Sequence, residues 1–244
     1  PLGSFGSTVV TGDRGGRISK FQADSGQKLW TANLDTYVER PFALAGNVLY
    51  AVTAAQVLYA LDFSNGKVLW LYDGGFPDGL TIRGAAKPIV HGGRIIFGLA
   101  SGDLVAVDQK SGKLAWRYNP SYNDARFHDV VGELVVSNNR LLISRYDGIV
   151  AAIDIAGGER VVVWQDKLPG ITTSAFRSGR YYVGALNGDI YAYDANTGRR
   201  IWRKSTGEAV SHLVPGEASL FAAGSNGRVS ALSPDGDILW HDNL

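Results

Sequence analysis

The 244-residue sequence contains no cysteine, which excludes disulfide bonds, thiolate metal sites and a thiol nucleophile. It has almost no net charge, because its 24 basic and 23 acidic residues nearly cancel. Its overall charge therefore gives no general attraction to nucleic acid or to an anionic membrane. No apolar run approaches the roughly 20 residues of a membrane-spanning helix. These absences leave a globular protein whose balanced surface favours a protein partner.

The chain does have an internal repeat, marked by its six tryptophans. They are Trp30, Trp70, Trp116, Trp164, Trp202 and Trp240. Successive tryptophans lie 40, 46, 48, 38 and 38 residues apart, and a period near forty residues is typical of propeller blades. An indole side chain buries roughly 150–250 Å². We therefore expect these tryptophans to be structural and largely buried between neighbouring sheets.

Each full repeat reads as four short strands, with no convincing helical periodicity. In the fifth repeat the strands are expected at residues 171–177, 180–185, 189–194 and 199–204, where apolar residues alternate between turns rich in Gly, Asn, Asp and Ser. The predicted fold class is all-β, a β-propeller of four-stranded antiparallel blades. About six blades are visible, and the first is incomplete.

Two turn positions recur in every repeat. One reads Gln22, Asp62, Asp108, Asp154, Asp194 and Ser233. The position six residues earlier reads Gly16, Gln56, Gly102, Gly148, Gly188 and Gly227. An Asp here can accept hydrogen bonds from the backbone of the hairpin that follows, and Gly supplies a tight turn. We interpret these carboxylates as turn caps rather than catalytic pairs.

The two ends of the sequence are less regular. Residues 1–4 resemble the remnant of an expression tag, so we expect a single propeller domain at residues 5–244. The first repeat starts near Ser7 with its second strand. Its innermost strand is either missing or made from tag residues. Whether the ring closes or the chain is a fragment of a longer protein is left open.

Departures from the repeat are the best candidates for function, because packing explains the repeat itself. Two connections between blades are long, at residues 73–83 and 120–128, and we expect them side by side on one rim. The first contains Leu80, Ile82 and Arg83, two aliphatic anchors with an Arg of the kind enriched at protein interfaces. Leu80 and Ile82 could instead pack under the rim.

Residues suited to catalysis or metal binding are sparse. The histidines are His91, His128, His212 and His241. They lack metal-ligand spacing, no nucleophile has a base nearby in the sequence, and the glycine-rich turns lack the Lys and helix of a phosphate loop. We expect no enzyme activity, no metal site and no cofactor.

A fuller motif links the chain to a known family. Ala192, Asp194, Thr197, Gly198 and Trp202 resemble the tryptophan-docking motif of pyrroloquinoline-quinone (PQQ) propellers. That family contains quinoprotein dehydrogenases, which hold their quinone between a Trp and a disulfide of adjacent cysteines, and the BamB assembly lipoproteins, which bind no quinone. The lack of cysteine favours the BamB branch. The alternative is a PQQ-like propeller of another role, either a sensor or ligand-binding domain or a fragment of a dehydrogenase.

The resemblance to BamB also implies a binding surface. The segment from Leu80 to Gly84 is similar to the Leu-Ser-Leu-Arg-Gly motif of that family, whose aliphatic residues and arginine contact the barrel protein BamA. An acidic segment on the next blade joins that contact, and here it is matched by Asp129, whereas Val131 replaces the second acid. The family also has eight blades rather than six.

The resemblance therefore implies binding to the periplasmic domains of BamA through Leu80, Ile82, Arg83 and Asp129. It also implies unfolded outer-membrane proteins as further partners, no nucleic acid, and a native N-terminus that is lipid-anchored on the periplasmic side of the outer membrane.

Overall fold

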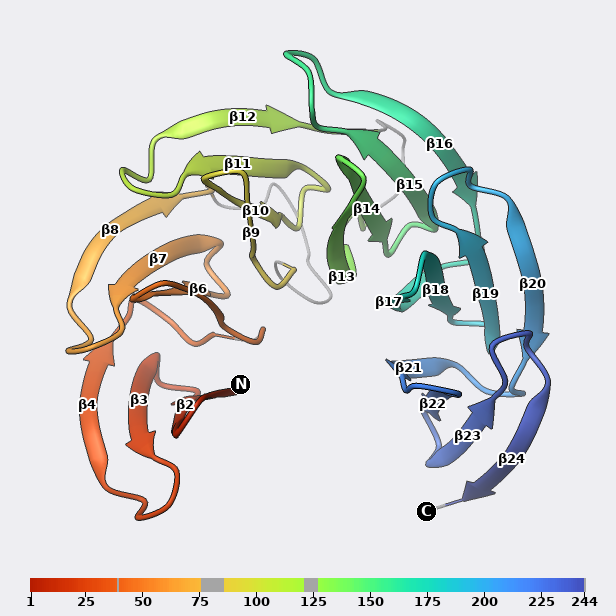
Figure 1. Ribbon diagram of the computed structural model, residues 1–244, viewed down its shortest axis with the longest axis horizontal. Coiled ribbons are helices and arrows are strands. Elements are labelled where there is room, and N and C mark those ends of the chain that lie inside the picture. The colour runs from red at the N-terminus through yellow and green to blue at the C-terminus, as the bar shows by residue number, and fades with distance from the viewer. Residues whose placement is uncertain (39, 76–85, 121–126, 244) are drawn as a thin grey trace. The chain divides into compact units, whose positions relative to one another are not determined.

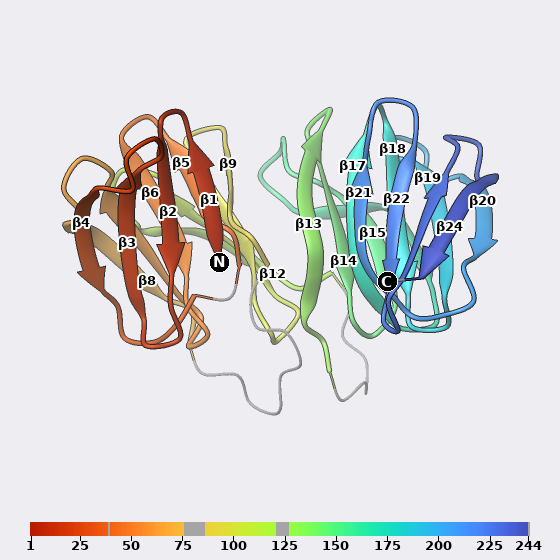
Figure 2. The same cartoon turned by 90° about the horizontal axis from the view of Figure 1, so that it is seen from below.

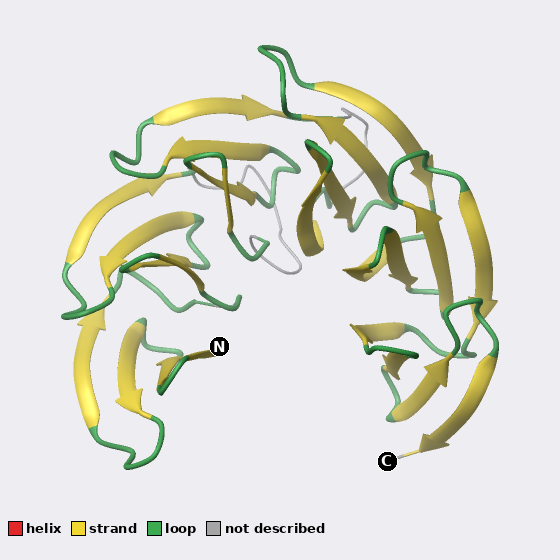
Figure 3. Cartoon of the chain, in the orientation of Figure 1, coloured by secondary structure: helices red, strands yellow, loops and turns green. Residues whose placement is uncertain are grey.

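The computed structural model describes residues 1–38, 40–75, 86–120 and 127–243, and their regular secondary structure is entirely β (Figures 1 and 3). These residues form six four-stranded antiparallel sheets. Within each sheet the strands follow one another in chain order, so every sheet is a simple meander. No helix of a length and hydrophobicity sufficient to cross a membrane occurs in this part of the chain. The predicted all-β class is confirmed.

The first sheet contains β1 (Leu2–Phe5), β2 (Thr8–Gly12), β3 (Arg17–Gln22) and β4 (Lys28–Asn33). The second contains β5 (Ala43–Ala45), β6 (Val48–Val52), β7 (Val57–Asp62) and β8 (Val68–Asp73). The third contains β9 (Ile89–His91), β10 (Arg94–Gly98), β11 (Leu104–Asp108) and β12 (Leu114–Tyr118). The fourth contains β13 (Val130–Ser137), β14 (Arg140–Arg145), β15 (Ile149–Asp154) and β16 (Val161–Lys167). The fifth contains β17 (Ile171–Arg177), β18 (Arg180–Ala185), β19 (Asp189–Asp194) and β20 (Arg200–Ser205). The sixth contains β21 (Val210–Pro215), β22 (Leu220–Gly224), β23 (Arg228–Leu232) and β24 (Ile238–Asn243).

The sheets are grouped into two compact units, Pro1–Asn119 and Pro120–Leu244, with three sheets in each. In unit 1, one core cluster lies between the first and second sheets and another between the second and third. In unit 2, the clusters join the fourth sheet to the fifth and the fifth to the sixth. Each hydrophobic core is thus a layer between neighbouring sheets, as the repeat pattern requires.

The strands match the sequence-based prediction closely. In the fifth sheet the first three strands have the expected bounds. The fourth strand, Arg200–Ser205, begins and ends one residue later than expected. The first sheet is complete, because Leu2–Phe5 pairs with β2 in the register Leu2↔Thr11 to Phe5↔Thr8 (Figure 2). Of the two alternatives for this strand, the residues of the presumed tag supply it. The expectation of an incomplete first sheet was wrong in this respect, because backbone pairing needs no apolar pattern.

The repeated carboxylates cap turns, as predicted. The Asp62 carboxylate accepts from the Ser64 amide at 2.8 Å, and the hydrogen bond from the Ser64 hydroxyl helps to hold the pKa of Asp62 below its usual value. Asp194 accepts from the Thr197 amide at 2.8 Å, and this bond lowers its pKa. These hydrogen bonds stabilise the hairpins that precede the strands of Trp70 and Trp202.

Four of the six tryptophans dock on the next sheet of their unit. Nε1 of Trp30, Trp164 and Trp202 donates to the main-chain oxygens of Phe63, Ala195 and Pro234 at 3.0, 3.1 and 2.8 Å, respectively. The rings lie against the turn glycines Gly66, Gly112, Gly198 and Gly236, where a Cβ atom would come within 2.4–2.7 Å of the indoles of Trp30, Trp70, Trp164 and Trp202. Glycine is therefore required for this close approach as well as for its positive φ.

The tryptophans are less buried than expected. Trp30 is buried, the next four are half-buried, and Trp240 is 48% exposed. For Trp240 the expectation of burial was wrong, because no turn among the described residues packs on its ring.

Each Trp-bearing strand also contains a β-bulge. The residues directly opposite the six tryptophans are Lys20, Ala60, Ala106, Ala152, Ala192 and Ala231, and a register shift follows each of them. In five of the six sheets this residue is an alanine, whose small side chain leaves room for the indole. The extra residue of the bulge bends the strand next to the indole ring.

Candidate protein-binding site

The aliphatic and arginine residues of the expected binding motif lie outside the described part of the chain. Leu80, Ile82 and Arg83 belong to residues 76–85, so their predicted exposure, and the alternative of packing under the rim, stay predictions. The structure does describe the residues on both sides of this segment, Gly75 and Ala86. Both flanks are hydrogen-bonded to sheets of unit 1.

Gln56 holds the preceding flank. Its side chain is buried, its Nε2 donates to the Gly75 oxygen at 3.1 Å, and its Oε1 accepts from the Ala100 amide at 2.7 Å. Its main-chain oxygen accepts from the Gly74 amide at 3.1 Å. Gln56 also has a φ of 64°, a left-handed conformation that Gly adopts in the other repeats and that is costly for Gln. In the sequence, the sign of this special role was that Gln56 stands where the five other repeats have Gly.

Ala86 holds the following flank. It is fully buried, and its amide donates to the Gly98 oxygen at the end of β10 at 3.1 Å. A buried alanine with a satisfied amide leaves little freedom to the backbone at this point. Gly75 and Ala86, the residues on either side of the predicted binding segment, are therefore held by hydrogen bonds to the second and third sheets.

Asp129 lies in unit 2, directly before β13, and its side chain is fully buried. Its main-chain oxygen accepts from the Tyr146 amide at 2.9 Å. The neighbouring His128 belongs to a charged cluster with Arg145 and Asp147. Because the Asp129 side chain is buried, any contact between Asp129 and a partner protein would also involve the residues around it. The expectation that it stands beside Arg83 stays a prediction.

The charged cluster is built on a bidentate ion pair. Arg145 Nη2 lies 2.6 Å from Asp147 Oδ2, and Arg145 Nε lies 3.1 Å from Asp147 Oδ1. Both side chains are almost completely buried. Arg145 Nη2 is also 2.8 Å from His128 Nδ1. Breaking such a buried pair is costly, so the cluster fixes the start of β13. Sequence analysis did not find it, because 17 residues separate His128 from Arg145.

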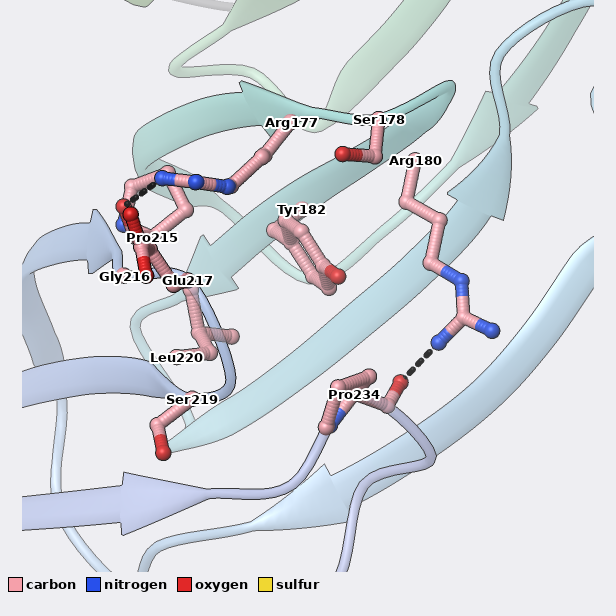
Figure 4. A pocket seen from close by; sticks show the side chains of 10 residues that line it. All are labelled: Arg177, Ser178, Arg180, Tyr182, Pro215, Gly216, Glu217, Ser219, Leu220 and Pro234. Atoms are coloured by element: carbon pink, nitrogen blue, oxygen red, sulfur yellow. Dashed lines mark hydrogen bonds between the residues drawn. The ribbon is translucent and has the colours of Figure 1, made fainter.

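A hollow of about 290 Å³ lies between the fifth and sixth sheets. Figure 4 shows the Arg177 and Arg180 guanidinium groups directed at the Pro215 and Pro234 oxygens. Arg140 makes the equivalent contact from the fourth sheet to the Asn196 oxygen. These arginines thus act as clamps between sheets. For Arg140 and Arg180 the sequence signal was an Arg at the start of the second strand of successive repeats, whereas Arg177 ends a first strand.

The described residues contain no group of three or more His, Asp or Glu side chains placed to hold a metal ion. His128 contacts Arg145, and His212 lies 3.3 Å from the hydroxyl of its neighbour Ser211. The histidines therefore take local structural roles wherever their contacts are known. The expectation that the protein has no metal or cofactor stays a prediction.

Comparison with known proteins identifies the family. The family described as "Outer membrane protein assembly factor BamB" matches residues 1–175 and 162–244, which together span the whole chain. The chain belongs to the BamB family. It is 23% identical to BamB of Yersinia pestis over 262 aligned positions, covering 96% of this chain and 64% of the relative. It is 36% identical to BamB of Burkholderia pseudomallei over 81 residues, covering 28% of this chain and 21% of the relative. The chain thus spans less than two thirds of either relative's length.

Solved structures confirm the propeller fold. The crystal structure of BamB from Moraxella catarrhalis matches with a TM-score of 0.87 at 22% identity, over 98% of this chain and 74% of that one. A quinohemoprotein alcohol dehydrogenase from Pseudomonas putida HK5 matches with a TM-score of 0.71 at 20% identity, over 88% of this chain and 43% of that one. At these identities the likeness concerns the fold. The predicted BamB-like propeller with PQQ-like repeats is confirmed.

Proposed function

We propose that this BamB-family chain is a non-catalytic scaffold in the assembly of outer-membrane β-barrel proteins. The observation that carries the proposal is the match to the assembly-factor family along the whole chain. The similarity to an alcohol dehydrogenase concerns the fold and supplies no chemistry. The lack of cysteine also argues against the disulfide on which the quinone of such enzymes rests.

The proposed partner is the periplasmic part of a BamA-like barrel protein, bound through Leu80, Ile82 and Arg83. Two aliphatic side chains next to an arginine have the composition of an interface hot spot. The anchors at Gln56 and Ala86 support this proposal, because they fix the residues on both sides of the segment that carries the motif. Asp129 is proposed as a further contact residue for the same partner.

The remaining assignments concern the domain and its location. We also propose a single propeller domain at residues 5–244, with residues 2–4 of the presumed tag remnant paired to its first sheet. The protein would act on the periplasmic side of the outer membrane, with a lipid-anchored native N-terminus. Unfolded outer-membrane proteins are further proposed partners.

The experiment is a binding titration of the periplasmic fragment of the cognate BamA-like protein against wild type and Arg83→Ala. Loss of an arginine anchor costs about 2 kcal/mol or more, which is roughly a thirtyfold loss of affinity. Arg14→Ala, at an exposed arginine in the turn before β3, is the matched control and should bind like wild type. Melting temperatures of all three proteins should agree. Equal affinities for wild type and Arg83→Ala would remove this surface from the proposal.

A further inference from the structure

Two arginines line the hollow between the fifth and sixth sheets, both of which belong to unit 2. Arg177 and Arg180 lie directly opposite each other at the end of the β17–β18 hairpin. Arg177 Nη1 reaches the Pro215 oxygen only at 3.4 Å, and Arg180 Nη1 donates to the Pro234 oxygen. A guanidinium has five N–H donors in a planar fork. Clamping the sheets therefore leaves most of these donors available to an anion.

A tyrosine hydroxyl faces the same hollow. Tyr182 lines the hollow and is only 5% exposed. Figure 4 shows its ring between Arg177 and Arg180, with the hydroxyl end directed into the space between them. This hydroxyl makes no hydrogen bond to the residues that the structure describes, whereas that of the adjacent Tyr181 is bonded to Ser174. A buried hydroxyl usually has a partner, so a ligand in the hollow is the natural acceptor.

A carboxylate of the chain itself already lies against Arg180. Asp235 Oδ1 is 3.3 Å from both Nη atoms of this arginine, and the Asp235 side chain is 79% exposed. An ion pair so exposed contributes little to stability and can be exchanged for another carboxylate. The hollow thus shows the ligand chemistry that suits it, a planar carboxylate against planar guanidinium groups.

The equivalent junction between the fourth and fifth sheets lacks these features. By strand register, the places of Arg177, Arg180 and Tyr182 are taken there by Ser137, Arg140 and Leu142. Arg140 contacts the Asn196 oxygen of the next sheet, much as Arg180 contacts that of Pro234. A junction between sheets therefore uses an arginine clamp at this position, but it needs neither a second arginine nor a tyrosine hydroxyl.

We propose that the hollow binds a carboxylate group of a partner protein. The Arg177 and Arg180 guanidinium groups would hold the two carboxylate oxygens, and the Tyr182 hydroxyl would donate a third hydrogen bond. The carboxylate belongs either to an acidic side chain or to the end of a polypeptide chain, which share this chemistry. The site is independent of the contact proposed for residues 80–83.

The charges of the hollow favour a carboxylate over a phosphate. Glu217 also lines it, so the two arginines are balanced by Glu217 and Asp235. A singly charged carboxylate that displaces Asp235 keeps this balance, whereas a doubly charged phosphate does not. Leu220 and Pro234 add apolar surface, on which the residues beside the bound carboxylate would pack.

The probes are three pentapeptides titrated into the isotopically labelled protein and followed by nuclear magnetic resonance. The first, acetylated and amidated Ala-Leu-Glu-Leu-Ala, has a side-chain carboxylate. The second, acetylated Ala-Leu-Gln-Leu-Ala, has a terminal carboxylate, and the third is its amidated form with none. The first or the second should shift the amides around the hollow and bind about tenfold more tightly than the third, as charge-assisted hydrogen bonds imply. The proposal is overturned if neither carboxylate peptide binds more tightly than the third.

Three variants test the residues of the site. Arg177→Gln, at an exposed position, should raise the dissociation constant of the carboxylate peptide about tenfold. Tyr182→Phe keeps the ring that packs against Trp202 and should raise it about fivefold, the equivalent of one neutral hydrogen bond. Asp235→Asn removes the competing carboxylate and should lower it about twofold to fivefold. Such a gain in affinity does not arise from damage to the fold.

Arg140→Gln is the matched control, because it removes the clamp between the fourth and fifth sheets and leaves the hollow intact. It should bind the peptide like wild type. Circular dichroism and melting temperatures should show that every variant is folded. The carboxylate site is contradicted if Arg177→Gln binds as tightly as Arg140→Gln, or if Asp235→Asn binds more weakly than wild type.

Discussion

At the scale of single residues, the surroundings decide what a repeated side chain contributes. Trp202 donates to the Pro234 oxygen and packs on Gly236, so it joins the fifth and sixth sheets. Trp240 occupies the same position of the next repeat with nearly half of its surface exposed. Trp202 and Trp240 thus occupy the same position of the repeat, but we expect them to contribute differently to the free energy of unfolding.

Trp202→Ala should lower the free energy of unfolding by about 2–4 kcal/mol, because it loses a half-buried indole and one hydrogen bond. Trp240→Ala should lower it by less than about 1 kcal/mol, as is usual for an exposed site. Denaturant titrations of dilute protein measure both values. Similar losses in the two variants would contradict the docking of Trp202 as an inter-sheet anchor.

At the scale of elements, a buried polar network joins the fourth sheet to the fifth. The Tyr181 hydroxyl donates to Ser174 Oγ at 2.9 Å and lies 3.2 Å from the Glu133 oxygen. The Ser144 hydroxyl lies 2.9 Å from Ser174 Oγ. Burial raises the pKa of Tyr181 to about 12. The sheets are therefore held together by hydrogen bonds within the apolar layer as well as by its packing.

Tyr181→Phe should cost about 1–2 kcal/mol at neutral pH, because it removes a buried hydrogen-bond donor. An unfolded tyrosine loses its proton near pH 10, whereas Tyr181 in the folded protein keeps it to about pH 12. Its contribution is therefore complete below pH 10 and is lost as the pH rises toward 12. Denaturant titrations across this range should show a shallower decline for Tyr181→Phe. The half-buried Tyr118, changed to Phe, is the control, and an identical decline in wild type and Tyr181→Phe would contradict the prediction.

A second element-scale feature is the turn between β6 and β7, where Gln56 stands in place of glycine. Gln56→Gly relieves the left-handed strain but removes the hydrogen bonds to Gly75 and Ala100. Gln56→Asn tolerates the backbone conformation but has a shorter side chain. We expect hydrogen exchange of the Ala100 amide to speed up about tenfold in both variants, the equivalent of one hydrogen bond. If the Ala100 amide of Gln56→Asn exchanges at the wild-type rate, the hydrogen bonds of the Gln56 side chain do not hold this turn.

The sequence predicted those elements whose cause is local and repeated. Asp194 caps its own hairpin and Gly198 turns it, so the pattern revealed both roles. The role of Gln56 could not be predicted in the same way, because its partners lie 19 and 44 residues away. The charged cluster at His128 likewise forms when distant residues meet. For the candidate binding site, the motif supplied Leu80, Ile82 and Arg83, and the structure supplied the anchored flanks.

At the scale of the whole molecule, the sheets form two compact units. Each has its own core layers between sheets and its own docked tryptophans. In repeat proteins, stability is approximately a sum of terms for each repeat and each interface between neighbours. Three sheets with two interfaces should therefore be enough for a folded fragment.

We expect residues 120–244 to fold when produced alone. The fragment retains the Trp164 and Trp202 contacts and the Tyr181 network, so its sheets keep their mutual interfaces. Circular dichroism should show β structure, and denaturant should unfold it cooperatively. A disordered spectrum, or unfolding without a transition, would show that unit 2 depends on the first 119 residues.

The bulge beside every tryptophan bears on aggregation. Each Trp-bearing strand lies at the edge of its sheet, and several expose aliphatic residues such as Leu69, Val163 and Leu239. A regular edge strand with such side chains is a template for the growth of amyloid-like fibrils. The repeated register shift breaks the even row of N–H and C=O groups that a fibril needs. Removing a residue such as Leu69, and with it the bulge, would straighten this strand and expose it to fibril growth.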